Sequence, residues 1–166
     1  MKSKAKYAAF MGIALALTAV LSFADSCISA AFPIPGIRLG LANIAIIAVM
    51  MRYGTVSGLL MTLLRSGFVF LTRGASAAVM SLSGGLLAFA AAVLMIIMKR
   101  SCKFSCIIAA MCHTLGQLAA ACVITGSVYT LAYAAVLMPV SIFTGFLTGT
   151  VLQALQGFLD DRKVVK

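Results

Sequence analysis

Long apolar runs, separated by short polar or glycine-containing breaks, extend along the whole chain. The runs lack the strict alternation of membrane β-barrel strands, and stretches of about twenty apolar residues are typical of transmembrane helices. We therefore predict an all-α membrane protein with six transmembrane helices, forming a single domain over residues 1–166. The predicted helices cover residues 7–24, 39–51 (with 28–37 leading into it), 55–71, 77–98, 104–125 and 129–158.

The basic residues gather at alternate breaks, and this distribution predicts the orientation of the chain. If the chain crosses the membrane six times, ten of its thirteen lysines and arginines fall on one side, and Arg38 and Arg73 fall on the other. Cytoplasmic loops carry the excess of basic residues, so both termini are expected in the cytoplasm. A secretory signal peptide is a competing interpretation of the N-terminus, although the first helix fits the topology without it. The ten residues are Lys2, Lys4, Lys6, Arg52, Lys99, Arg100, Lys103, Arg162, Lys163 and Lys166.

The composition excludes several classes of protein. With 63% hydrophobic and 10% charged residues, the chain cannot cover itself with a water-facing surface, and the lipid bilayer is its expected environment. The net charge of +10 comes from bases scattered among apolar runs, so we expect no nucleic-acid partner. The five cysteines are odd in number and without paired spacing, and we infer no disulfide from them.

One interruption, "FPIPGIRLGLANI" at residues 32–44, stands out within this apolar chain. Pro33 and Pro35 cannot lie inside a helix without disrupting it, and Gly36 allows a tight turn. The segment therefore predicts a structured loop between the first two helices. Because the loop is itself apolar, it either folds back as the wall of a pocket or forms a simple connection in which Arg38 reaches the lipid headgroups.

Arg65 is the strongest candidate for a functional side chain, because an arginine within a membrane span is costly and is a functional hypothesis by default. Asp25 is the only acid outside the C-terminal tail, so an ion pair with Arg65 is a structural alternative. Asp25 is equally well interpreted as a solvated loop residue or as a partner of Arg38 or Arg73. If the outer halves of the second and third helices converge, Arg38, Arg65 and Arg73 surround one cavity, and such an arrangement suits phosphate or carboxylate. Asn43 lies near the same end.

His113 and Gln117 are four residues apart and share one face of the fifth helix. No second histidine or membrane carboxylate completes a metal site, so we expect polar contacts with a ligand there and neither metal nor cofactor. On the sixth helix, Ser141, Thr144 and Thr148 form a polar stripe interpreted as structural, and Gly145 and Gly149 have the spacing for close helix packing. The first helix carries small residues spaced by four that serve either packing within the bundle or docking of a partner, namely Ala8, Gly12 and Ala16.

The chain is not expected to be an enzyme. It has one histidine, no glycine-rich phosphate loop with a lysine, and no nucleophile motif. The aspartate pair in "LDDRK" at 159–163 is too little for metal-dependent diphosphate chemistry, which needs several carboxylates around magnesium.

Four blocks, "PIPGIRLGLANI" at 33–44, "LLRSGFVFLTRG" at 63–74, "SLSGGLLAF" at 81–89 and "HTLGQLAAA" at 113–121, resemble a bacterial membrane family. This family is known as Gx transporter or heptaprenyl diphosphate synthase component I, and it is similar to the substrate-capture (S) components of energy-coupling factor (ECF) transporters. The resemblance implies a six-helix bundle with cytoplasmic termini in the bacterial cytoplasmic membrane. It also implies docking through Ala8, Gly12 and Ala16 onto a transmembrane coupling subunit that works with two ATPase subunits.

Two functional hypotheses follow. In the first, the chain is an S-component-like subunit that captures a small ligand, anionic or resembling a vitamin or isoprenoid, from the outer face. Its ligand-binding residues are then Asn43, Arg65, Arg73, His113 and Gln117, with Arg38 at the rim. In the second, the chain is a non-catalytic membrane component of a heptaprenyl diphosphate synthase. A purely structural role leaves Arg65 and the interrupted loop unexplained.

Overall fold

The computed structural model describes residues 2–31, 40 and 42–161, with side chains described at 4–27, 40 and 42–155. This part of the chain is helical and contains no strand. Five helices are long and apolar enough to cross a membrane, and one shorter apolar helix accompanies them, which confirms an all-α, multi-pass architecture. The elements are α1 (Lys2–Ala31), α2 (Ala42–Tyr53), α3 (Thr55–Arg73), α4 (Ala75–Ile97), α5 (Cys102–Thr125), the 3-10 helix η1 (Val128–Tyr133) and α6 (Ala134–Asp161).

The structure differs from the sequence prediction mainly at two helix boundaries. α1 continues through the stretch around Asp25 to Ala31 instead of ending near residue 24. The last predicted span is divided, because η1 precedes α6 and the long helix begins only at Ala134. Hydropathy alone does not reveal this division, since both parts are apolar. The predicted loop at 32–38 lies outside the described residues.

Single glycines make the two tightest connections. Gly54 joins α2 to α3 and Gly74 joins α3 to α4, with φ angles of 92° and 87°. Such positive φ values are strained for residues with a side chain and are accessible to glycine. The chain can therefore reverse direction within one residue, which keeps α2, α3 and α4 adjacent.

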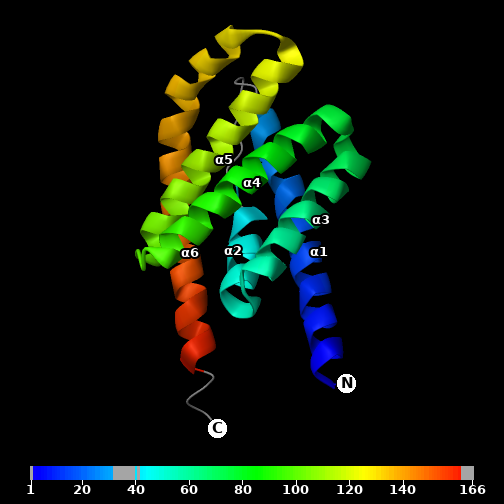
Figure 1. Ribbon diagram of the computed structural model, residues 1–166, viewed down its shortest axis with the longest axis vertical. Coiled ribbons are helices and arrows are strands. Elements are labelled where there is room, and N and C mark those ends of the chain that lie inside the picture. Colours follow the sequence, from blue (N-terminus) through cyan, green and yellow to red (C-terminus); the bar gives the residue numbers. More distant parts are fainter. Residues whose placement is uncertain (1, 32–39, 41, 162–166) are drawn as a thin grey trace.

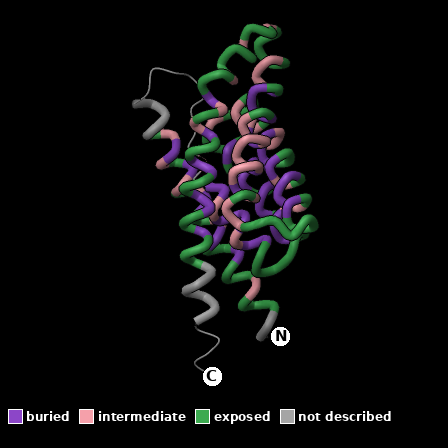
Figure 2. Tube along the Cα trace, turned by 90° about the vertical axis from the view of Figure 1, so that its left-hand side faces the viewer, coloured by how far each residue is buried: buried purple, intermediate pink, exposed green. Residues whose placement is uncertain are grey.

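The helices form a ring with one helix on its outside. α2, α3, α4, α5 and α6 each pack against the next, and α2 closes the ring by contacting α6, while α1 lies against α2 and α3 (Figure 1). The beginning of α1 and the end of α6 lie at the same end of the bundle (Figure 1). Buried residues concentrate in the middle of the bundle, and its two ends carry mostly exposed and intermediate positions (Figure 2). α2 thus contacts three other helices, α1, α3 and α6.

Close helix packing depends on small residues at two crossings. A Cβ atom on Gly116 of α5 would lie 2.7 Å from the Ser83 carbonyl oxygen of α4. On α6, Gly145 and Gly149 would each place a Cβ 2.7 Å from an α5 Cα atom, which confirms the close packing predicted from their spacing. Glycines allow the backbones to approach so closely, as in other membrane helix pairs.

We expect Gly116→Ala to destabilise the protein by roughly 1–3 kcal/mol, because its methyl group overpacks a contact with backbone that cannot rotate away. Gly67→Ala on α3 is the matched control, since a Cβ there meets nothing within 4 Å. The measurement is thermal unfolding in detergent, followed by the reaction of the native cysteines with a fluorogenic maleimide. Equal unfolding temperatures for the two variants would contradict the close α4–α5 crossing.

Candidate functional site

Buried polar side chains are the feature that distinguishes the interior of this bundle from an ordinary apolar core. Every helix of the ring, and α1 outside it, contributes at least one, and each of these side chains is at most 8% exposed. Polar groups inside a membrane protein are costly unless hydrogen-bonded, so they mark places where the chain needs polarity. They are Thr18, Ser22 and Asp25 of α1, Asn43 of α2, Ser57, Thr62, Arg65 and Ser66 of α3, Ser81 of α4, His113 and Gln117 of α5, and Ser141, Thr144 and Thr148 of α6.

Arg65 and Asn43 form the central contact of this site. The Arg65 Nη1 donates a hydrogen bond of 2.7 Å to the Asn43 Oδ1, and the two side chains are 4% and 8% exposed. A donor that carries a full charge makes this bond stronger than one between neutral groups. Asn43 can reach Arg65 because it lies in the first turn of α2, where its backbone N–H donates to the Gly40 carbonyl at 2.9 Å. The structure thus brings together two of the residues predicted as ligand contacts.

His113 and Gln117 form a second polar pair, as their spacing predicts. The Gln117 Nε2 and His113 Nε2 lie 3.0 Å apart in the interior. Both side chains pack against Gly84 of α4, where a Cβ would lie 2.8 Å from the Gln117 Cγ and 3.1 Å from the His113 Cε1. The neighbouring residue, Gly85, faces α3, since its Cβ would lie 2.7 Å from the Thr62 Cγ2. The two adjacent glycines therefore let α4 pass between the two polar pairs.

Arg73, Asp25 and Arg38 were predicted to lie near the outer face, and the structure bears differently on each of these predictions. Arg73, at the end of α3, is half-buried and donates from its Nη2 to the Ser22 carbonyl at 2.9 Å, so its recorded bond is to α1. Asp25 lies within α1 and is 2% exposed, which shows that its interpretation as a solvated loop residue was wrong. Its pairing with an arginine stays a prediction. Arg38 lies outside the described residues.

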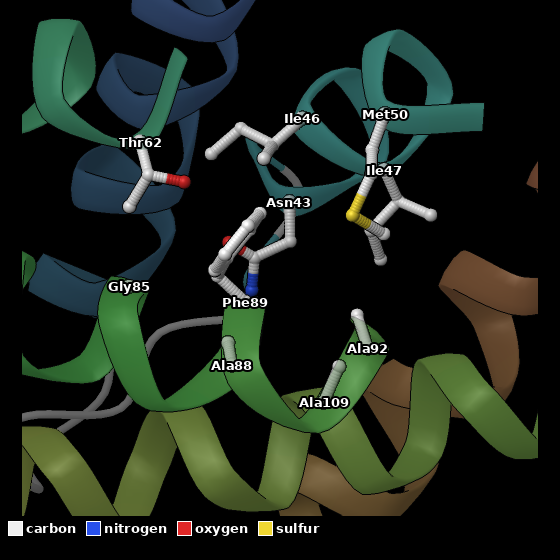
Figure 3. Close-up of a pocket in the computed structure, with 10 residues that line it drawn as sticks. All are labelled: Asn43, Ile46, Ile47, Met50, Thr62, Gly85, Ala88, Phe89, Ala92 and Ala109. Carbon is white, nitrogen blue, oxygen red and sulfur yellow. The ribbon is translucent and has the colours of Figure 1, made fainter. Parts of the chain in front are cut away.

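A small cavity adjoins the Arg65–Asn43 pair. It has about 20 Å³ of space, which is enough for one water molecule. Figure 3 shows Asn43, Ile46, Ile47 and Met50 of α2 facing Ala88 and Ala92 of α4 and Ala109 of α5. Thr62 of α3 lines the same cavity. The polar end of the cavity is thus formed by Asn43 and Thr62, and the remainder is apolar.

The hydroxyl groups of α6 behave as structural residues. Ser141 Oγ, Thr144 Oγ1 and Thr148 Oγ1 each donate to a carbonyl of their own helix three or four residues back, at 2.7–3.2 Å. These bonds satisfy the hydroxyls without any other helix, as expected from the sequence. Within the described residues, no group of three or more histidine, cysteine or acidic side chains could hold a metal ion.

Sequence analysis missed Thr62 and Ser81 as parts of this site. Ser81, 1% exposed, begins the inward stripe of α4 that continues through Gly85, Ala88 and Ala92. This spacing of four, three and four marks one face of a helix, so the signal was present in the sequence. It was weak because a serine among alanines and glycines is ordinary in membrane helices.

The predicted docking residues of α1 do not pack into the bundle. Ala8, Gly12 and Ala16 are all exposed, and a Cβ on Gly12 would meet nothing within 4 Å. A different face of α1, with Met11, Ala14 and Thr18, is buried against the other helices. Of the two alternatives, packing within the bundle is therefore wrong for the described chain, and docking stays a prediction.

The fold and the buried polar layer define a multi-pass helical membrane protein. A family model described as heptaprenyl diphosphate synthase component I matches residues 13–155, and the chain belongs to this family. The match confirms the resemblance inferred from the four sequence blocks. Searches of curated proteins and of solved structures found no significant match.

We expect Asn43→Ala to lower the free energy of unfolding by about 1–3 kcal/mol, because it removes an acceptor from a buried charged donor. Asn43→Asp keeps an acceptor oxygen and should cost less. Thermal unfolding in detergent measures both. The control is Asn43→Ala in an Arg65→Met background, where the acceptor has no charged donor to satisfy and the effect should nearly vanish. An undiminished effect in that background would show that the bond is not what Asn43 contributes.

Proposed function

We propose that this protein is the substrate-binding subunit of an ECF-type importer and captures a small ligand with an anionic group from the outer face of the bacterial cytoplasmic membrane. The observation that carries the proposal is Arg65, a charged side chain held in the interior by Asn43. An arginine within a membrane span is costly and is a functional hypothesis by default, and a guanidinium with several donors suits a carboxylate or phosphate. His113 and Gln117, beyond Gly84, add further polar contacts.

The proposal includes a topology of six crossings with both termini in the cytoplasm. The end of the bundle where α1 begins also carries the turns after α2 and after α4, and its basic residues are Lys4, Lys6, Arg52, Lys99, Arg100 and Lys103. The excess of basic residues at this end supports its placement in the cytoplasm. With 12 residues α2 is about 18 Å long, short of the roughly 30 Å hydrocarbon core, so its crossing needs the preceding segment as well.

Cysteine labelling tests this topology. In intact cells, a membrane-impermeant maleimide should label Tyr129→Cys, because residue 129 is 89% exposed in η1 at the outer end. It should label Lys99→Cys only after lysis. The unmodified chain, with its native cysteines, gives the background signal. The reverse pattern of labelling would invert the protein and place the basic end outside.

The proposed partners are a transmembrane coupling subunit and two ATPase subunits, and we propose that this chain itself is not an enzyme. The exposed stripe of Ala8, Gly12 and Ala16 supports the first part, because a flat, small-residue face lets another helix approach closely. The site supports the second part: the buried histidine has Gln117 as its recorded partner, and its neighbours offer polar contacts without a nucleophile activated by a base.

A second candidate function has support from the family description. As component I of a heptaprenyl diphosphate synthase, the protein would bring a soluble synthase to the membrane, and the matching family model bears that name. Such a role needs an accessible cytoplasmic surface, for which Lys99, Arg100 and Lys103 are available. It does not account for the Arg65–Asn43 pair in the interior.

Purification of the full chain from its native membrane, followed by mass spectrometry of retained small molecules and proteins, tests the importer. We expect a bound anionic metabolite together with a coupling subunit and ATPases. Arg65→Ala should reduce the retained metabolite roughly tenfold or more, because charged hydrogen bonds are lost, while the partner proteins stay bound. Gly12→Leu should have the opposite effect, losing the partners and keeping the metabolite.

Two controls make the outcome specific. Arg52→Ala removes an exposed arginine, and Gly67→Leu adds the same side chain to another helix position with open space. Neither should change retention. A soluble prenyl synthase in place of the ATPases, with no metabolite, would favour the second candidate. Loss of the folded protein in Arg65→Ala, seen by size-exclusion chromatography, would favour a structural role for the arginine.

A further inference from the structure

The buried hydroxyl groups fall into two sets. Seven of nine donate to the carbonyl three or four residues back along the chain, at 2.7–3.3 Å. The hydroxyls of Ser22 and Ser81 make no hydrogen bond within the described chain. Helical serines usually satisfy themselves on the preceding turn, so a buried one that does not is an exception that needs a reason. The seven residues are Thr18, Ser57, Thr62, Ser66, Ser141, Thr144 and Thr148.

Ser81 lies between the two polar pairs of the site. α3 and α4 are antiparallel and joined at Gly74, so Ser81 comes opposite Ser66, and the contact of Gly85 with Thr62 one turn further on agrees with this register. On the same helix, Ser81 precedes Gly84 by three residues and therefore shares its face, which packs against Gln117. This register places Ser81 at the level of Ser66 on α3, and one turn before Gly84, which meets Gln117 on α5.

An unpartnered hydroxyl in this place has no structural benefit. Ser81 is 1% exposed, and an alanine would fill nearly the same volume without the cost of a buried, unsatisfied polar group. Ser22 is different, because it lies on α1 outside the ring, beside the Arg73 contact. Residues that lower stability without a structural gain are characteristic of functional sites.

We propose that Ser81 is a specificity-determining residue that donates a hydrogen bond to an anionic oxygen of the ligand. This inference rests on the proposed capture of an anionic ligand. Arg65 supplies the positive charge, and the Ser81 hydroxyl supplies a neutral donor from the neighbouring helix. Carboxylate and phosphate oxygens both accept such a bond, so the shared chemistry is an anionic oxygen that binds between α3 and α4.

The test compares Ser81→Ala with Ser66→Ala, the same substitution on the opposite helix at a serine whose hydroxyl donates to the Thr62 carbonyl at 3.0 Å. Thermal unfolding of the detergent-purified full chain is measured with sodium chloride alone, and with inorganic phosphate or acetate at matched ionic strength. Without added anion, Ser81→Ala should unfold at or above the wild-type temperature, since it removes an unsatisfied group, and Ser66→Ala should unfold below it.

With added anion, wild type and Ser66→Ala should be stabilised by phosphate or by acetate, and the anion that acts distinguishes the two ligand classes. Ser81→Ala should bind that anion roughly ten- to a hundredfold more weakly, because it lacks a hydrogen bond to a charged group. Ser81→Cys, which keeps the volume with a poorer donor, should lie between, and it replaces Ser81→Ala if that variant does not fold.

Three outcomes would overturn the inference. An undiminished response of Ser81→Ala to the anion would remove Ser81 from the site while leaving the anionic ligand intact. A loss of stability in Ser81→Ala equal to that of Ser66→Ala, without added anion, would show that Ser81 has a structural partner. Absence of any response in the wild type would reject the anionic ligand itself, and with it both this inference and that part of the proposed function.

Discussion

The rest of the structure depends on the burial of Arg65 inside a bundle of membrane helices. An arginine at the centre of a span costs about 2.5–3.5 kcal/mol on insertion scales, and the cost falls only when its donors find acceptors. The Asn43 carbonyl oxygen at 2.7 Å is one such acceptor, and α2 positions it. For this bond to form, the first turn of α2 has to lie beside the middle of α3. Seven of its 12 residues are buried, so α2 serves as an internal support more than as a lipid-facing span.

The glycines of α4 and α5 allow the polar pair of His113 and Gln117 to be buried between helices. His113 and Gln117 need room in the interior, yet the helices around them must still exclude lipid. At the crossing, Gly84 leaves space for both side chains, and Gly116 allows the α4 backbone to approach, with the Ser83 hydroxyl donating to the Gly116 carbonyl at 2.9 Å. The same two glycines therefore make room for the polar side chains and allow the helices to pack closely. A larger side chain at either glycine would disturb both.

Much of the helical architecture was predictable from the sequence, because long apolar runs are strong local signals. The partition into helices, the inward position of Arg65 and the pairing of His113 with Gln117 all follow from such local patterns. The hydrogen bond of Arg65 to Asn43 was not predictable, because three-dimensional register, which no local pattern encodes, brings that amide within reach. Asp25 lies buried on α1, and its pairing with an arginine stays a prediction. Ser81 was not predicted as a site residue for the same reason, because the absence of a hydrogen bond to its hydroxyl is a property of the packed bundle.

The small size of the interior cavity means that a ligand can bind only if existing contacts inside the protein are broken. About 20 Å³ beside Asn43 accommodates one water molecule, whereas sites for small molecules typically have roughly 300–1,000 Å³. In the proposed importer, a ligand anion therefore has to compete with contacts already formed, above all the bond between Arg65 and Asn43. Any affinity is the difference between the new bonds and those given up, and the ligand favours an opened arrangement only as far as it binds that arrangement more tightly. An unpartnered donor such as Ser81 changes this balance, because bonding to it gives up nothing inside the protein. A site built from an arginine already hydrogen-bonded to a neutral amide and a hydroxyl that has no hydrogen bond in the described chain can thus hold its arginine without ligand and still gain net free energy when an anion binds.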